Sequence, residues 1–227
     1  MRRSDLSIFG ISILPVIVIA LCLLLLKSMV AAFVLYHIVI CLILPALYLE
    51  FYPRKGQKLV ELLGLRRGRV GKSIIVGLVV GVLFFVTIIL FFQFFGNVFL
   101  SGEHITTRLT GWGYDKNLLV WLALYFIFFN AVVEEIFWRG FLFSYYRNLF
   151  GEYHGSVLLS FCFIQYHFIT IWLLFSFATA VFFTPFLFFT SFFWCYLRIK
   201  YNNIYAPIIS HLFADLAIMF VYYTLVI

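Results

Sequence analysis

Four ionisable side chains interrupt long apolar stretches in the second half of the chain, and together they could activate water. Glu134, His167, His211 and Asp215 each lie within a run of hydrophobic residues. An ionisable group inside a membrane span costs about 2.5–3.5 kcal/mol even on a lenient insertion scale, so each one needs a reason. Carboxylates and histidines can take a proton from water directly or hold a metal that does so. We therefore interpret these four residues as a candidate catalytic site.

Spacing along a helix separates the roles of the neighbouring charges. Glu135 and Arg139 are four residues apart with the acid first, the favourable order for an ion pair on one helix. We predict that this pair is structural and shapes the site. Glu134 projects about 100° away from Glu135, so it is predicted to be free of that pair and available as a base. His211 and Asp215 are also four residues apart and share a face.

The depth of these residues indicates one shared site. At a rise of about 1.5 Å per residue, His167 and Asp215 lie roughly 16 Å from the inner ends of their predicted spans, His211 roughly 10 Å and Glu134 roughly 18 Å. Three predicted helices therefore place polar groups in one layer of the inner half of the membrane. We expect a water-filled site open to the cytoplasmic side. Asn130, one turn before Glu134, either lines this site or makes a helix–helix hydrogen bond.

Composition sets the fold class that must position these side chains. Hydrophobic residues make up 65% of the chain and charged residues 11%, whereas a soluble domain is nearer half apolar and a quarter charged. In lipid, only helices and closed barrels satisfy the backbone. Long unbroken apolar runs favour helices over barrel strands of about ten alternating residues. The sequence therefore predicts an all-α, polytopic membrane helix bundle, with residues 1–227 as a single transmembrane domain.

About seven spans are expected from the apolar runs. A tight turn at Lys27 and Ser28 separates the first two, and a short interfacial helix is expected around residues 59–65. A polar loop is predicted for residues 101–117, and a hidden turn near residues 170–178 should divide one long uncharged stretch. The predicted spans are residues 8–26, 29–50, 73–100, 118–146, two within 156–197, and 204–227.

Basic residues orient this topology. With the N-terminus inside, twelve of the sixteen basic residues fall on the inner side and three on the outer side, so the N-terminus is predicted to be cytoplasmic and the C-terminus outside. We expect the membrane to be a prokaryotic cell membrane. No nucleic-acid partner is expected, since no basic soluble domain exists to bind one. Contact with anionic lipid is expected at the 54–72 loop, which holds seven basic residues: Arg54, Lys55, Lys58, Arg66, Arg67, Arg69 and Lys72.

The remaining histidines and cysteines carry no pattern that predicts chemistry. His37, His104 and His154 are isolated in the sequence and are assigned no role in the site. The cysteines lie inside apolar runs without metal-binding spacing, which favours small buried hydrophobic side chains; they are Cys22, Cys41, Cys162 and Cys195.

Three motifs in order resemble those of the CPBP family, which comprises CAAX proteases and bacteriocin-processing enzymes and is also called Abi. They are EExxxR at Glu134 to Arg139, FxxxH at Phe163 to His167, and HxxxN/D at His211 to Asp215. The resemblance covers residues 118–227, the predicted motif-bearing region. It implies an intramembrane endopeptidase in which Glu134 and His167 activate water, while His211 and Asp215 support the oxyanion.

The resemblance leaves the metal open and includes departures. A metal-free mechanism without a cofactor is favoured; if a divalent metal such as zinc takes part, its ligands are Glu134, His167 and His211. Gln165 and Tyr166 stand where small residues usually precede the histidine. Asp215 stands where many members have asparagine, which can donate a hydrogen bond to an oxyanion. Asp215 is therefore protonated, orients His211, or ligates a metal.

Three functions compete on this sequence. The favoured one is an intramembrane endopeptidase, a hydrolase acting near the inner leaflet on a prenylated tail, a bacteriocin leader or a membrane-anchored sorting segment. A non-catalytic membrane regulator that binds a partner protein is the second, although it would have no need for the intact glutamate and histidines. A proton-coupled transporter is the third, since Glu, His and Asp chains also build proton relays, but neither a repeat nor a broken helix is evident.

Overall fold

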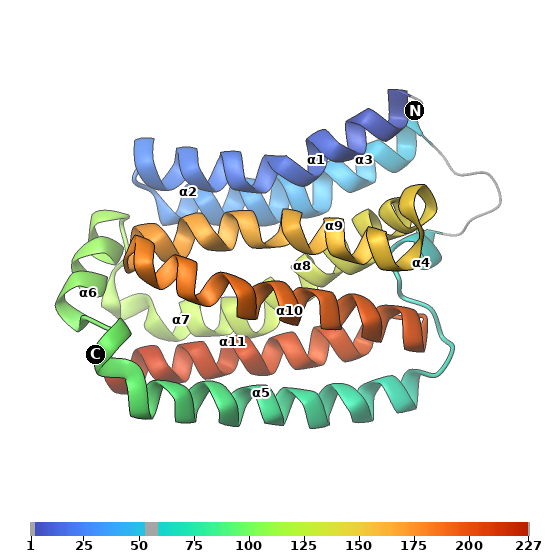
Figure 1. The fold of residues 1–227 in the computed structure, drawn as a ribbon. Helices are drawn as coiled ribbons and strands as arrows, with labels where there is room; N and C mark the ends of the chain where they lie inside the picture. The colour runs from blue at the N-terminus through green and yellow to red at the C-terminus, as the bar shows by residue number, and fades with distance from the viewer. Residues whose placement is uncertain (1–2, 53–58, 227) are drawn as a thin grey trace.

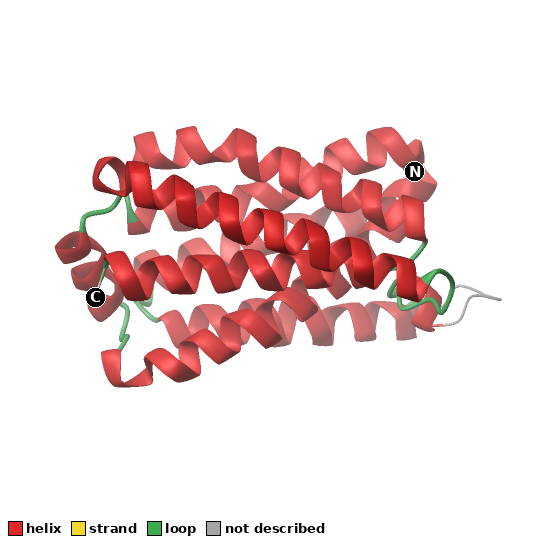
Figure 2. Ribbon diagram, turned by 90° about the horizontal axis from the view of Figure 1, so that it is seen from below, coloured by secondary structure: helices red, strands yellow, loops and turns green. Residues whose placement is uncertain are grey.

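Long apolar helices run side by side through the protein, of which a computed structural model describes residues 3–52 and 59–226 (Figure 1). Within these two ranges the chain forms no strand. Seen from below, the loops are confined to the two ends of the bundle, and only helix lies between them (Figure 2). Helices satisfy their own backbone groups, as a lipid-facing chain requires. The predicted all-α polytopic bundle is confirmed.

The first half of the chain supplies three long helical stretches. The first is α1 (Arg3–Ala20), which continues into a π-helical turn (Leu21–Leu25). The second combines α2 (Met29–Phe33), a π-helical stretch (Val34–Ile43) and α3 (Leu44–Phe51). The third is α5, and short helices precede and follow it: α4 (Leu59–Leu62), α5 (Val70–Phe99) and α6 (Gly102–Gly111).

The second half begins with a short 3-10 turn (Lys116–Leu118) and contains the helices that carry the motifs. Its first pass alternates α-helical and π-helical segments: α7 (Leu119–Leu124), a π-helical turn (Tyr125–Asn130), α8 (Ala131–Glu135) and a second π-helical segment (Ile136–Leu142). The remaining helices are α9 (Phe143–Leu174), α10 (Phe177–Tyr201) and α11 (Tyr205–Leu225).

Six helical stretches of the described chain are long and apolar enough to cross a membrane, and one of them is long enough to cross twice. That stretch, Leu119–Leu174, has 56 residues, or about 84 Å of helix against a hydrocarbon core of about 30 Å. Gly151, at φ 78° and ψ 175°, breaks it in a conformation that glycine adopts readily. Figure 1 shows α7 and α9 running in opposite directions and the two termini at opposite ends, as an odd number of passes requires. Six candidate stretches, one of them long enough for two passes, agree with the predicted polytopic bundle, and the count of about seven spans stays a prediction.

Contacts between loops group the ends of the helices as the sequence predicted. After the second span, Arg69 donates from Nη1 to the Lys200 carbonyl (3.0 Å), and the Gly64 carbonyl accepts from Ile204 N–H (3.1 Å). At the other end, Met29 N–H donates to the Trp112 carbonyl at 2.9 Å. The loops assigned to one side therefore lie together. Of the basic loop, Arg54, Lys55 and Lys58 fall outside the described residues, and so does Arg2 at the N-terminus.

The predicted turns occur where expected, but one predicted loop contains a helix. Ser28 caps α2 by accepting from Ala31 N–H (3.1 Å), and Ser176 caps α10 within the predicted hidden turn. The 101–117 segment is not a loop throughout, because α6 occupies its first part. Ile105 and Leu109, one turn apart, are both buried in α6. This single apolar pair is too short a pattern to stand out in a polar segment.

Close packing of α5 against α11 holds the last motif-bearing helix in place. A Cβ atom at Gly77 would lie 2.9 Å from the Ala206 Cα, and one at Gly81 would lie 2.8 Å from the Phe213 ring. Small residues allow such close approach between helices in lipid. Ser73 of α5 completes the contact, since its Oγ accepts from Ala206 N–H at 2.9 Å. The N-terminal end of α11 is therefore fixed before its chain reaches the site.

Replacing Gly140 by alanine is expected to lower the Tm by several degrees. Gly140 packs against the backbone of Leu63, where a Cβ atom would meet the carbonyl group, and overpacking of this kind costs about 1–3 kcal/mol. Thermal unfolding in detergent measures the effect. The matched control is Gly71→Ala, since a Cβ atom there meets nothing within 4 Å. Equal Tm values for both variants would show that the contact with Leu63 is loose.

Candidate active site

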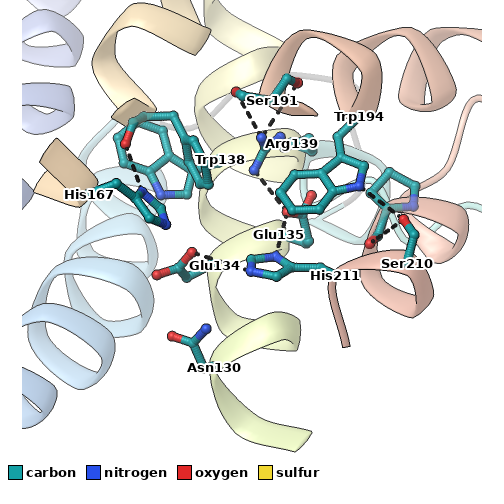
Figure 3. Close-up of polar contacts among 12 residues, drawn as sticks. Asn130, Glu134, Glu135, Trp138, Arg139, His167, Ser191, Trp194, Ser210 and His211 are labelled. Atoms are coloured by element: carbon teal, nitrogen blue, oxygen red, sulfur yellow. Dashed lines mark hydrogen bonds and ion pairs between the residues drawn. The ribbon is translucent and has the colours of Figure 1, made fainter. Parts of the chain in front are cut away.

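Three helices bring the predicted site residues together within the bundle. Glu134 projects from α8, His167 from α9, and His211 with Asp215 from α11. In Figure 3 the side chain of Glu134 lies between the rings of His167 and His211, with Asn130 one turn away on the same helix. The Glu134 Oε2 and His211 Nε2 atoms are 3.9 Å apart. Residues separated by up to 85 positions therefore face one another.

Glu134 is fully enclosed and, contrary to the sequence prediction, is not free of partners. Only 2% of its surface is exposed. Its Oε2 accepts a hydrogen bond from the Tyr166 hydroxyl at 2.7 Å, and its Oε1 lies 3.5 Å from His37 Nε2. The prediction considered only neighbours on the same helix, whereas these partners come from other helices. Glu134 is thus a held carboxylate rather than an uncommitted one.

The predicted ion pair between Glu135 and Arg139 is present and completely buried. Arg139 Nη1 donates to Glu135 Oε1 at 2.8 Å, and both side chains have 0% exposure. Arg139 also donates from Nη2 to Ser191 Oγ at 2.8 Å, and its guanidinium lies over the rings of Phe163 (4.3 Å) and Trp194. The charge is therefore compensated by a carboxylate, a hydroxyl and two aromatic faces, as burial of a charge requires.

Glu135 also orients His211, which gives the ion pair a second role. The His211 Nδ1 atom lies 3.0 Å from Glu135 Oε1. An ionised carboxylate only accepts hydrogen bonds, so Nδ1 carries the hydrogen of this contact. Trp194 stacks on the imidazole with 4.5 Å between ring centroids. The ring is fixed with Nε2 turned towards Glu134 and towards Asp215 Oδ1, 3.6 Å away.

His167 keeps Nε2 available for chemistry, because its Nδ1 is occupied by a backbone contact. Its Nδ1 lies 3.2 Å from the Phe163 carbonyl oxygen one turn earlier. A carbonyl oxygen only accepts, so Nδ1 donates, and a neutral ring keeps the lone pair on Nε2. Figure 3 shows the ring turned towards Glu134. Nε2 of His167 and the carboxylate of Glu134 thus form two proton acceptors on one side of the site.

Asp215 is held between an amide and an imidazole. Asn130 donates from Nδ2 to Asp215 Oδ2 at 2.9 Å, while Asp215 Oδ1 faces His211 Nε2 at 3.6 Å. Asn130 therefore makes the helix–helix hydrogen bond that the sequence analysis left as one of its two roles. Of the three roles left open for Asp215, orienting His211 is the one that these contacts fit directly.

Residues 116–217 match the family model described as Type II CAAX prenyl endopeptidase Rce1-like. This segment is similar to the Rce1-like family. The resemblance to CAAX proteases that the three motifs indicated is thereby confirmed. The match spans a little under half of the chain and contains every residue of the three motifs. No curated protein and no solved structure matches the chain.

The donors of the Rce1-like segment do not fit a preformed metal centre. Among the described residues, no group of three His, Cys, Asp or Glu side chains is arranged to hold a metal ion. One donor atom of the proposed ligand set already has a partner, since Glu134 Oε2 receives the Tyr166 hydroxyl. We therefore derive no chemical step through a metal.

Sequence reasoning missed two residues that touch Glu134. His37 was assigned no role, yet it is buried against Glu134 from outside the Rce1-like segment. The depth argument places His37 in the layer assigned to Glu134, because it lies thirteen residues, or roughly 20 Å, from the inner end of its predicted span. Tyr166 was noted only as a departure from the motif. Its hydroxyl donates to the carboxylate, a contact that a small residue could not make.

Proposed function

We propose that this chain is an intramembrane endopeptidase that cleaves a peptide or membrane-associated protein near the inner leaflet. The Rce1-like match supports a protease, a hydrolase with a peptide or protein substrate at the membrane. The observation that carries the proposal is the convergence of Glu134, His167 and His211 from three separate apolar helices. Ionisable groups gathered at one place in membrane-spanning helices are expected to be functional.

In the proposed reaction, Glu134 and His167 activate water. A water molecule between the carboxylate and His167 Nε2 loses a proton to Glu134 as its oxygen attacks the scissile carbonyl carbon. The carbonyl oxygen becomes an oxyanion, and Glu134 then delivers the proton to the leaving amine nitrogen. His211 contacts Glu135 through Nδ1 and faces the carboxylates of Glu134 and Asp215 through Nε2, so we take it to carry a hydrogen on both nitrogens. As an imidazolium it supports the oxyanion from Nε2. Asp215 acts on the same side of the site by orienting His211.

We propose that this reaction needs no metal, so the enzyme would be of the glutamic type. The contact that supports this is the hydrogen bond from the Tyr166 hydroxyl, which occupies Glu134 Oε2. The Nδ1 contacts of the two histidines fit either mechanism, because metal-bound histidines usually donate their second nitrogen to a carboxylate or carbonyl. A chelator separates the two mechanisms, and we expect the same activity with and without it.

The substrate class that these features favour is a peptide with a lipidated tail. The family's description names a CAAX prenyl endopeptidase. An apolar cavity of about 370 Å³ lies beside the site, where Ile136, the residue after Glu135, meets side chains of α3 and α4. Its lining is Cys41, Leu42, Pro45, Ala46, Leu49, Glu50, Leu59, Leu62, Leu63 and Ile136. A bacteriocin leader or a sorting segment would use the same chemistry without this cavity.

The proposed function is tested with the purified protein in liposomes. The probes are a farnesylated peptide ending in a CAAX sequence and the same peptide without the lipid. We expect endoproteolytic cleavage of the farnesylated peptide by the wild-type protein, undiminished by chelator. Absence of cleavage of both probes and of a membrane-protein library, by a folded protein, would refute the endopeptidase. Cleavage of the library alone would keep the peptidase and replace the substrate class.

Replacing Asp215 by asparagine is expected to leave activity within a few-fold of wild type. The new side chain can accept from Asn130 through its oxygen and present its amide to the site, as the residue common in the family does. Initial rates on the farnesylated peptide measure the effect, with Asp115→Asn, the same change at an exposed position, as control. A dead Asp215→Asn variant, in a protein inhibited by chelator and restored by zinc, would replace the metal-free mechanism with a metal-dependent one.

A further inference from the structure

His37 reaches the site from a helix that lies outside the Rce1-like segment. It belongs to the π-helical stretch of the second span, and only 2% of its surface is exposed. Tyr36 and Tyr125 pack against the imidazole, with ring centroids 4.5 Å and 5.6 Å away. A buried polar group normally has a hydrogen-bond partner, so the groups that face the two ring nitrogens of His37 indicate its role.

The two ring nitrogens of His37 face one neutral group and one carboxylate. Nδ1 contacts the hydroxyl of Tyr125, and Nε2 lies 3.5 Å from Glu134 Oε1. In the described part of the chain, Nε2 is buried and makes no hydrogen bond. The acceptor that it faces is Glu134 Oε1, an oxygen of the proposed catalytic base.

Tyr125 determines which nitrogen of His37 carries the hydrogen. The phenol can donate to Nδ1, and a neutral imidazole then carries its hydrogen on Nε2, pointing at Glu134. The other tautomer would turn the Nε2 lone pair towards a carboxylate, which is repulsive. At 3.5 Å the two atoms are farther apart than in a formed hydrogen bond, and contacts of catalytic groups often tighten only when substrate binds.

We propose that His37 is a positioning residue that holds Glu134 in its reactive orientation, with Tyr125 fixing the His37 tautomer. This inference rests on the proposed function, because Glu134 must act on water for its orientation to matter. Tyr166 holds one carboxylate oxygen at 2.7 Å, and His37 holds the other from the opposite helix. Two donors on different oxygens prevent rotation about the terminal bond of the side chain. The remaining lone pairs then stay aimed at the space that His167 and His211 border.

The test compares two replacements of His37 that separate shape from hydrogen bonding. His37→Phe keeps an aromatic ring of similar size and removes the donor, whereas His37→Gln gives up the ring but keeps an N–H at about the reach of Nε2. On the farnesylated peptide we expect His37→Phe to lower kcat by about 100-fold with KM within about twofold, since small misplacements of a reacting group cost this much. His37→Gln should recover at least about tenfold of that loss.

Further variants complete the design. Tyr125→Phe should lower kcat by an intermediate factor, since it frees the tautomer without removing the imidazole. His154→Phe, at an exposed histidine, is the matched control and should behave as wild type. If His37→Phe keeps wild-type kcat, or if His37→Gln is no better than His37→Phe, the positioning role is refuted.

A second readout does not depend on cleavage. Residues in contact show coupled effects on stability, whereas independent sites add. We therefore expect the Tm loss of the His37→Phe/Glu134→Gln double variant to differ clearly from the sum of the two single losses. Additive losses would refute the contact between the two side chains even if the wild-type protein cleaves peptide. Coupled losses in a protein that cleaves nothing would keep the contact and refute the proposed function instead.

Discussion

Replacing Glu134 by glutamine is expected to abolish peptide cleavage while leaving the fold intact. Glutamine has the same shape, and its carbonyl oxygen can still accept the hydrogen bond from the Tyr166 hydroxyl. It cannot take a proton from water, and loss of a general base slows catalysis by about 10²–10⁴-fold. The measurement is the initial rate of cleavage of the farnesylated peptide, together with the Tm of each protein in detergent.

The control for this change is Glu103→Gln, which makes the same substitution at an exposed residue of α6. It should retain wild-type rate and wild-type Tm. Wild-type turnover by Glu134→Gln would remove Glu134 from the role of base. A large fall in its Tm would instead show that the carboxylate is needed to hold the helices together.

Removing either member of the Glu135–Arg139 pair is expected to destabilise the protein as well as inactivate it. Both side chains are completely buried, so Glu135→Ala leaves an unpaired guanidinium and Arg139→Ala leaves an unpaired carboxylate. Breaking a buried ion pair in this way costs about 3–5 kcal/mol. Activity should fall too, because Glu135 also accepts from His211 Nδ1. Thermal unfolding and yield of folded protein measure the first effect, and peptide cleavage the second.

An exposed ion pair elsewhere in the chain provides the comparison. Glu61 and Arg66 are 3.8 Å apart, with 42% and 34% of their side chains exposed. Such pairs contribute up to about 1 kcal/mol, so Glu61→Ala should change the Tm little. If Glu135→Ala and Arg139→Ala unfolded at the same temperature as Glu61→Ala, the buried pair would not be the structural element that its geometry indicates.

The arrangement of spans was predictable because each one is a physical necessity visible in local sequence. Apolar runs of about 20 residues must be helices in lipid, and Ser28 and Ser176 mark turns that the structure contains. The helix α6 was not predicted, since its apolar face is only Ile105 and Leu109. Tertiary contact with the end of the bundle, rather than local pattern, decides whether such a segment is helical.

The site was predictable to the extent that its members are ionisable. The cost of burying a charge singled out Glu134 and His211, and their contact is observed at 3.9 Å. Tyr166 and Tyr125 carry no such cost, so nothing in their residue type marks them, although Tyr166 donates to Glu134 and Tyr125 contacts His37. The contact of His37 with Glu134 also depends on which spans are neighbours, and a single sequence does not contain that information.

The π-helical turn Tyr125–Asn130 explains how one imidazole can touch two residues of the same helix. Tyr125 and Glu134 are nine positions apart, which is two and a half turns of an α-helix at about 3.6 residues per turn, and would place them on opposite sides. A π-helical turn absorbs one extra residue within the helix. The pair then behaves as if eight positions apart, and both side chains meet His37. A homologue with one residue fewer in this turn would present the same pair from an uninterrupted α-helix. Residue spacing therefore predicts which side chains share a helix face within the EExxxR motif. It does not do so across the π-helical turn that precedes the motif, where a separation of nine residues places two side chains as a separation of eight would in an α-helix.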